Sequence, residues 1–171
     1  GCDGGEAGRY GARVETLDRR GNFSVRMPDD FNVGYRTVRE RDGSAGAGIF
    51  TAAWFRFPQG DPAQARGRIK ELLTKRIATQ PLALPNAGSV FRNPPGDHAA
   101  RLIESCGLKG RRVGAAEVSP RHANFIVNTG GASAADIESL IDEVRATVKA
   151  KTGVALVPEV RIVGSKEASH G

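Results

Sequence analysis

The stretch Asn86–Pro94 reads N-A-G-S-V-F-R-N-P and lies between two segments whose apolar residues recur at helical spacing. Gly88 has no Cβ, so the backbone there can turn sharply or approach a ligand closely. The Ser89 hydroxyl can donate or accept a proton, and Arg92 and Asn93 supply donors that suit phosphate or amide groups. Taken alone, the stretch is more simply interpreted as a loop whose serine and asparagine satisfy its own backbone.

The length of 171 residues allows one domain of ordinary size, or one small domain and a piece of another. There is no run of 18 apolar residues and no charged-then-apolar leader, so we expect a cytoplasmic protein with no membrane partner. The chain starts at Gly1 and not at Met, which suggests an internal start. Cys2 and Cys106 lie too far apart for a spaced metal or disulfide motif, so we expect reduced thiols and no metal.

The formal net charge of +6 favours an anionic partner by long-range attraction. A nucleotide or a phosphorylated small molecule fits that charge. Nucleic acid is disfavoured, because the basic residues are spread out and do not alternate with aromatic residues. We therefore expect no nucleic-acid partner.

The first half of the chain is rich in predicted strands. The runs 12–18 and 23–27 are compatible with strands, and the turn signal at residues 20–22 between them predicts a hairpin. Residues 31–38 read as an irregular connection, and residues 49–57 as a buried strand because they are β-branched and aromatic. Asp61 followed by Pro62 predicts the start of a helix.

The second half alternates between helices and strands. Asp97 is the expected cap of a helix whose apolar stripe ends at Cys106, which we interpret as a core residue and not a nucleophile. Strands are expected over 113–118, 124–128 and 156–163, and Ser133 with Asp136 predicts a capping box for a long helix. Two helices over one face of a small sheet make an α+β fold. The proline-rich segment after residue 78 predicts a boundary between domains at 1–78 and 79–171.

Several motifs, in this order along the chain, resemble one known family. They are Gly34-Tyr35-Arg36, Arg76-x-x-x-Gln80-Pro81, the stretch from Gly88 to Pro94, Ser119-x-x-His122-x-Asn124-Phe125-Ile126-Val127-Asn128, and Pro158-Glu159-Val160. Together they resemble the UDP-N-acetylenolpyruvoylglucosamine reductases, the MurB flavoenzymes of peptidoglycan precursor synthesis. The resemblance covers nearly the whole chain, from about Gly1 to Gly164, and its specificity comes from the order of the motifs.

The resemblance implies that residues 1–78 are the C-terminal portion of an FAD-binding region and residues 79–171 a substrate-binding domain. The glycine-rich phosphate loops that the family carries further upstream are absent. Gly1, Gly4 and Gly5 resemble the tail of one flavin-binding segment, in which Asp3 replaces the usual aromatic residue. The implied cofactors are FAD and NADPH, the implied substrate is UDP-N-acetylglucosamine enolpyruvate, and the expected state is a monomer.

In the family reaction, NADPH reduces FAD, the reduced flavin gives hydride to the enolpyruvyl double bond, and a proton is added at the neighbouring carbon. By resemblance, Ser89 is the proton donor, Glu159 is the acid that stabilises or protonates the enol intermediate, and Arg36 is the cation near the substrate carboxylate. A guanidinium and an acid lower the cost of the charge that develops there. Six further residues are implied to bind substrate, although Asn93 and His122 could equally brace loops: Tyr35, Arg76, Gln80, Arg92, Asn93 and His122.

Two alternatives compete with this reading. Another FAD oxidoreductase that shares the flavin region would lack a second domain with the Ser89, His122 and Glu159 motifs, so the sequence argues against it. The second alternative is a non-catalytic fragment that binds a UDP-sugar, because the expected flavin site is incomplete.

Overall fold

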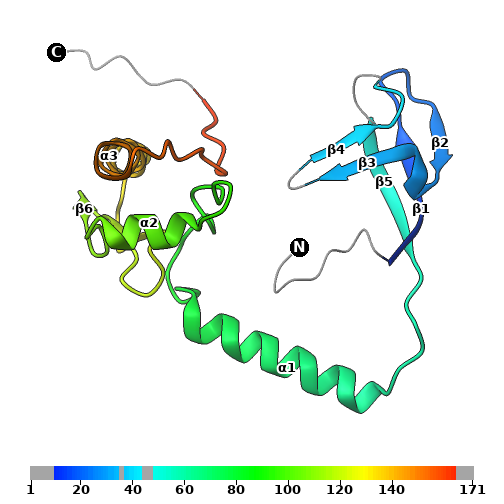
Figure 1. Ribbon diagram of the computed structural model, residues 1–171, viewed down its shortest axis with the longest axis horizontal. Coiled ribbons are helices and arrows are strands. Elements are labelled where there is room, and N and C mark those ends of the chain that lie inside the picture. The colour runs from blue at the N-terminus through cyan, green and yellow to red at the C-terminus, as the bar shows by residue number, and fades with distance from the viewer. Residues whose placement is uncertain (1–9, 35–36, 44–47, 165–171) are drawn as a thin grey trace. The chain divides into compact units, whose positions relative to one another are not determined.

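The computed structural model describes residues 10–34, 37–43 and 48–164, and the chain divides into two compact units between Ile69 and Lys70 (Figure 1). The first unit is built from antiparallel strands and the second from two helices and a small antiparallel sheet. The expected α+β class is therefore confirmed. The functional domains 1–78 and 79–171 stay a prediction. No helix among the described residues is both long and apolar enough to cross a bilayer.

A three-stranded antiparallel sheet in the order β2-β1-β5 forms the centre of the first unit. Strands β1 (Gly11–Leu17) and β2 (Phe23–Arg26) form the predicted hairpin. Its turn is closed by Asp18, whose Oδ1 accepts hydrogen bonds from the backbone N–H groups of Arg20 at 2.7 Å and Asn22 at 2.9 Å. Aspartate is favoured in such turns because its short side chain can replace a backbone acceptor.

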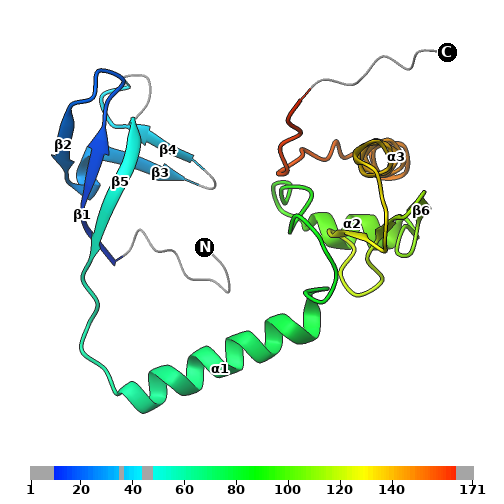
Figure 2. The same ribbon diagram turned by 180° about the vertical axis from the view of Figure 1, so that it is seen from behind.

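The irregular connection expected over 31–38 is wrong. After a 3-10 helix at Pro28–Asp30, the chain forms a second hairpin from β3 (Phe31–Gly34) and β4 (Thr37–Glu40). Figure 2 shows this hairpin next to β5, where the ring centroids of Phe31 and Phe50 lie 5.5 Å apart. Strands β3 and β4 are only four residues long, so their residue pattern is too short to predict a hairpin. Contact with β5 stabilises this hairpin, and that contact is not visible in the sequence.

Strand β5 (Ile49–Phe55) forms as predicted, but the prediction that it is buried is wrong. Ile49 is 67% exposed and Trp54 is 38% exposed. The described residues of this unit place no helix over the sheet. The β-branched and aromatic residues predicted the strand correctly. Burial also requires another element to cover the strand, which composition does not predict.

Helix α1 (Pro62–Thr79) begins where predicted, and Asp61 Oδ1 accepts a hydrogen bond from the Ala63 N–H at 2.9 Å. Its apolar residues Ile69, Leu73 and Ile77 are more than half exposed. A helix of 18 residues with no buried side chain must rely on its caps and intrinsic propensity within the described residues.

The sheet of the second unit has the order β6-β7-β8, from β6 (Arg112–Val113), β7 (Ala116–Val118) and β8 (Ile126–Asn128). The single strand expected over 113–118 is wrong, because the chain turns back at Gly114. This glycine has a φ of +54°, and a Cβ there would lie 2.6 Å from the Asp136 carboxyl group. Only a glycine fits a turn this close to the next helix.

Helix α3 (Ala134–Thr152) has the predicted capping box, in which Ser133 Oγ accepts from the Asp136 N–H at 3.1 Å. Helix α2 (Ala99–Ser105) has its stripe as expected, but Asp97 is not its cap. His98 occupies the cap position, and the acceptor for the first helical N–H comes from Asn93, whose Oδ1 lies 3.1 Å from the Ala99 nitrogen.

One apolar core joins α2, α3 and the sheet, and the two helices lie side by side in both views (Figures 1 and 2). The fully buried side chains come from α2, α3, β7, β8 and the segment around Phe91. They include Phe91, Ile103, Val118, Val127, Leu140, Val144 and Val148. Cys106 is buried and unpaired on this core, as expected. This unit therefore has a closed core of its own.

Candidate functional site

The segment that carries Ser89 is held on one side by Asn124. Val90 and Phe91 are buried, and the Val90 N–H donates to the Asn124 carbonyl oxygen at 2.9 Å. The Asn124 side chain makes two further hydrogen bonds to Phe91. Its Oδ1 accepts from the Phe91 N–H at 3.0 Å and its Nδ2 donates to the Phe91 carbonyl at 2.8 Å. Both backbone groups of a buried residue are thus satisfied by one side chain.

On its other side the same segment contacts residues 157–159. The Arg92 N–H donates to the Val157 carbonyl at 2.9 Å, and the Glu159 N–H donates to the Val90 carbonyl at 2.8 Å. The strand expected over 156–163 is wrong, because only the bridge between Phe91 and Pro158 forms. Proline has no N–H to extend the pairing. The bridge nevertheless brings the Ser89 and Glu159 motifs, about 70 positions apart in sequence, to one place.

The turn that precedes Ser89 is built by Asn86. Its Oδ1 accepts from the Gly88 N–H at 2.9 Å, while its Nδ2 donates to the carbonyls of Pro81 at 3.1 Å and Leu84 at 2.8 Å. Gly88 has a φ of +80°, and a Cβ there would meet nothing within 4 Å. Open space at a glycine with this conformation leaves room for a flat group to lie against the backbone.

His122 lies in the loop between β7 and β8 and supports Asn124. Its Nδ1 accepts from the Asn124 N–H at 3.3 Å, and its ring lies edge-on to Phe125 with centroids 4.8 Å apart. Burial lowers the pKa of His122 below its ordinary value of 6.5, and nearby Lys109 adds a small effect in the same direction. Nδ1 can accept only when it carries no proton, so the hydrogen bond and the lowered pKa favour the same neutral form.

We expect the His122 contribution to stability to be complete above pH 6.5 and to be lost as pH falls through the lowered pKa. A lowered pKa means that the unfolded chain binds the proton more readily in that range, so acid favours unfolding. The measurement is the free energy of unfolding of this chain between pH 7.5 and pH 5, compared with His122→Gln, which does not titrate. The variant should show a shallower pH dependence.

The control for that titration is His98→Gln, because His98 is exposed and makes no side-chain contact to Asn124 in the described residues. It should keep the pH dependence of the unaltered chain. Equal slopes for His122→Gln and the unaltered chain would contradict the role of the neutral imidazole.

The remaining predicted site residues fall into three groups. Arg76 donates through Nε to Gln80 Oε1 at 3.1 Å, so these two residues lie together at the end of α1. Arg92 and Asn93 follow Phe91, and the Arg92 side chain is exposed. Asn93 braces the start of α2. The other predicted positions lie outside the described residues: Gly1, Gly4, Gly5, Tyr35 and Arg36.

Three residues of the site had no role in the sequence analysis. Ser119 is buried, and its Oγ accepts from the backbone N–H groups of Arg121 at 3.2 Å and His122 at 3.3 Å. The Arg121 guanidinium donates to the Ile77 carbonyl at 3.1 Å, which fastens this loop to the last turn of α1. Asn124 lies within the motif from Ser119 to Asn128, which gives it no role of its own. The signal that could have found it is a polar residue between Ala123 and Phe125 in an apolar run.

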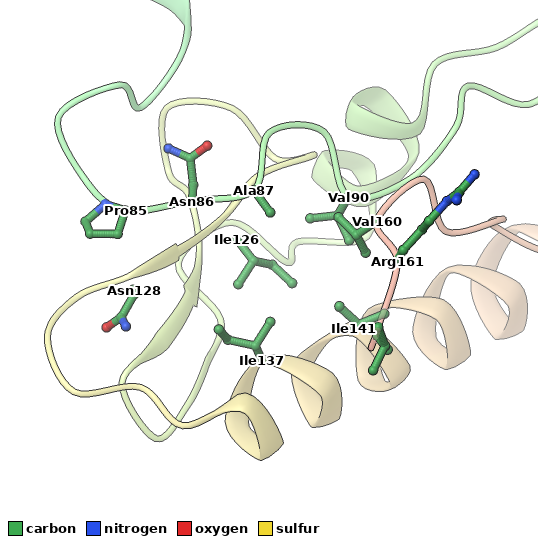
Figure 3. Close-up of a pocket in the computed structure, with 11 residues that line it drawn as sticks. Pro85, Asn86, Ala87, Val90, Ile126, Asn128, Ile137, Ile141, Val160 and Arg161 are labelled. Atoms are coloured by element: carbon green, nitrogen blue, oxygen red, sulfur yellow. The ribbon is translucent and has the colours of Figure 1, made fainter. Parts of the chain in front are cut away.

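A cavity of about 310 Å³ lies next to this segment, between β8, α3 and residues 160–162 (Figure 3). Apolar side chains of Val90, Ile126, Ile137, Ile141 and Val160 converge on it, whereas the Arg161 side chain extends away from them. Ser89, His122 and Glu159 are not among its lining residues. The side chains that line this cavity include no carboxyl group and no histidine.

The backbone contacts bring the segment of Ser89, a hydroxyl residue, next to the segment of Glu159, a carboxyl residue, and Arg92 is exposed in the first of these segments. Residues of these types are suited to proton transfer to an anionic substrate. Within residues 10–34, 37–43 and 48–164 there is no group of three His, Cys, Asp or Glu side chains that could hold a metal ion.

A family model of the UDP-N-acetylenolpyruvoylglucosamine reductase C-terminal domain matches residues 80–163, the part of the chain that holds Ser89, His122 and Glu159. Through these residues, the chain belongs to the UDP-N-acetylenolpyruvoylglucosamine reductase family. The resemblance inferred from the motifs is thereby confirmed.

The similarity to individual reductases extends beyond that domain. The reductase of Thiobacillus denitrificans is 53% identical over 167 residues, which are 98% of this chain and 51% of that protein. The reductase of Alkalilimnicola ehrlichii is 56% identical over 168 residues, 98% of this chain and 55% of that protein. The crystal structure of the MurB reductase of Thermus caldophilus is 33% identical with a TM-score of 0.76, and the match covers 94% of this chain and 56% of that one. The chain spans about half the length of the reductases that it matches.

Proposed function

We propose that this chain carries the substrate-reducing part of a UDP-N-acetylmuramate dehydrogenase. This oxidoreductase uses NADPH and FAD to reduce UDP-N-acetylglucosamine enolpyruvate to UDP-N-acetylmuramate in the cytoplasm, as a step of peptidoglycan and cell-wall synthesis. The observation that carries the proposal is the hydrogen bond of 2.8 Å between the Glu159 N–H and the Val90 carbonyl. This contact supports the proposal because Glu159, the proposed acid, lies beside Val90, which follows the proposed proton donor Ser89.

Ser89 supplies the proton for the carbon next to the one that receives hydride. A serine hydroxyl is a weak acid, so this step needs stabilisation of the negative charge on its oxygen. Glu159 stabilises or protonates the enol form of the substrate, and Arg36 pairs with the substrate carboxylate. Arg92 and the pair Arg76 and Gln80 supply donors for the diphosphate, uridine or amino sugar, together with Tyr35, Asn93 and His122.

FAD, if bound, would supply the hydride chemistry between NADPH and the substrate double bond. The backbone at Gly88 is open, with a φ of +80° and no atom within 4 Å of a Cβ built there, so a flat group could lie against it. Gly1, Gly4 and Gly5 would contact the cofactor in this proposal. We further propose that the enzyme acts as a monomer.

The direct test is a two-step kinetic measurement on the full-length reductase that we propose for this chain. NADPH should bleach the flavin absorbance, and UDP-N-acetylglucosamine enolpyruvate should restore it with formation of UDP-N-acetylmuramate. Restoration by oxygen alone, with no change in the sugar nucleotide, would refute the proposed substrate.

A second candidate function is the binding of a UDP-sugar without reduction. The specific observation in its favour is that residues 70–164 have their own core and contain Ser89, Arg92 and Glu159. Under this alternative, the chain alone should bind UDP-N-acetylglucosamine, as measured by calorimetry, and Arg92→Gln should weaken binding by about fivefold to tenfold because a charge-assisted hydrogen bond is lost. Arg66→Gln, on the exposed face of α1, is the matched control. No heat of binding with the chain alone would leave the reductase as the supported function.

A further inference from the structure

Backbone hydrogen bonds join the Ser89 segment to the Glu159 segment. Neither residue is fixed there by a regular sheet, because the bridge between Phe91 and Pro158 is isolated. Something else must hold the Ser89 segment in a defined position against residues 157–159. A single backbone bridge has little resistance to local opening.

Asn124 is the residue with the geometry to do this. It is 4% exposed, and its carboxamide makes one donor and one acceptor bond to the backbone of Phe91, at 2.8 Å and 3.0 Å. In doing so it takes the place of a neighbouring strand. Its own carbonyl accepts the Val90 N–H at 2.9 Å, and the Val90 carbonyl accepts the Glu159 N–H at 2.8 Å. Asn124 thus makes three hydrogen bonds to Val90 and Phe91, and Val90 makes a fourth hydrogen bond to Glu159.

Asn124 is itself held in place by the loop before it. Its N–H donates to His122 Nδ1 at 3.3 Å, and the Ser119 hydroxyl accepts the N–H of His122 at 3.3 Å. The amide is a group that supplies both a donor and an acceptor without charge, which a buried site requires. An aspartate would keep the acceptor for the Phe91 N–H and lose the donor for the Phe91 carbonyl.

We propose that Asn124 is a positioning residue that sets Ser89 relative to Glu159 by clamping the backbone of Val90 and Phe91. The expected effect on kinetics rests on the proposed function. The clamp, meaning the hydrogen bonds of Asn124 to Val90 and Phe91, rests on the structure alone. The two parts are tested separately.

The clamp is tested by amide hydrogen exchange on the chain itself, comparing Asn124→Leu with the unaltered protein. Leucine has a similar shape and removes both side-chain hydrogen bonds. The Phe91 and Glu159 amides should exchange about tenfold faster in the variant, while the Val144 amide in the core of α3 stays within twofold. If the Phe91 amide alone becomes faster, Asn124 does not act on Glu159 and the proposal is overturned.

Asn128→Leu is the matched control, since Asn128 also makes two side-chain hydrogen bonds to backbone groups, from Gly130 at 2.9 Å and Ala132 at 3.1 Å. It should leave the Phe91 and Glu159 amides unchanged. Should Asn124→Leu fail to fold, Asn124→Asp keeps the acceptor for the Phe91 N–H and removes only the bond to the Phe91 carbonyl. The Glu159 amide should then still exchange faster than in the unaltered protein, and an unchanged Glu159 amide would overturn the proposal.

The kinetic part uses the full-length reductase. Asn124→Leu should lower kcat for substrate-dependent flavin reoxidation by about 10- to 100-fold through misplacement of the proton donor, with KM within threefold and the rate of flavin reduction by NADPH unchanged. Equal loss of both half-reactions would mean a merely structural role and would overturn the proposal. If the unaltered reductase fails to use the substrate, the proposed function fails, while the exchange measurement still decides whether the clamp exists.

Discussion

Ser89→Ala in the full-length reductase proposed here is expected to slow reoxidation of the reduced flavin by substrate about 10²- to 10⁴-fold, the range typical of a lost general acid. Reduction of the flavin by NADPH should be unchanged, because no proton from Ser89 enters that step. The reason lies in the chemistry of the methyl group, which cannot donate a proton to the substrate carbon. Stopped-flow absorbance of the flavin measures the two half-reactions separately.

Ser139→Ala is the matched control, because Ser139 is exposed on α3 and makes no hydrogen bond to the Ser89 segment among the described residues. It should leave both rates unchanged. Equal reoxidation rates in Ser89→Ala and the unaltered enzyme would remove Ser89 from the mechanism.

Leu140→Ala is expected to destabilise residues 70–164 by about 2–5 kcal/mol, because it removes a fully buried side chain and leaves a cavity. Leu140 is 0% exposed in the core between α3, α2 and the sheet. Total stabilities of domains are about 5–15 kcal/mol, so this is a large share. Urea unfolding followed by circular dichroism at the helix band measures it.

The choice of probe matters for that experiment. The chain has one tryptophan, Trp54, and it lies in the first unit, so its fluorescence does not report on the core around Leu140. Ser139→Ala, one residue earlier on the exposed face, should change stability by less than about 0.5 kcal/mol. A loss below about 1 kcal/mol for Leu140→Ala would contradict the burial described here.

Features that depend on neighbouring residues were predictable from the sequence. The capping box of Ser133 and Asp136, the turn closed by Asp18 and the start of α1 at Asp61 all involve contacts within four positions. Such contacts need only local backbone geometry. The apolar stripes of α2 and α3 were also visible, because helical spacing marks the buried face.

Features that depend on distant partners were not predictable. Residues 156–163 have the composition of a strand, yet Pro158 blocks the pairing and a partner is available only at Phe91. Whether β5 is buried depends on which other elements cover it, and its own residues do not reveal that. Asn124 acts across 33 positions, so the motif indicated its presence but not its function.

For the site itself, the sequence motifs lead to a prediction of the residues that matter, and the structure adds how the segments that carry Ser89 and Glu159 contact each other. Ser89 and Glu159 carry no common local pattern. Their proximity depends on the backbone of Val90, which accepts from Glu159 and donates to Asn124. A hydrogen bond between backbone groups leaves no signature in the identity of the residues that make it.

The isolated bridge at Phe91 also has a consequence for the order of events during translation. Glu159 follows Ser89 by about 70 positions, which at ordinary ribosome speeds of about 5–20 residues per second corresponds to roughly 4–14 seconds. For that time the nascent Val90 and Phe91 lack the partner that residues 157–159 supply, although Asn124 emerges about halfway through the interval. The asparagine is therefore the earlier of the two partners to reach this segment, and the carboxyl group arrives last.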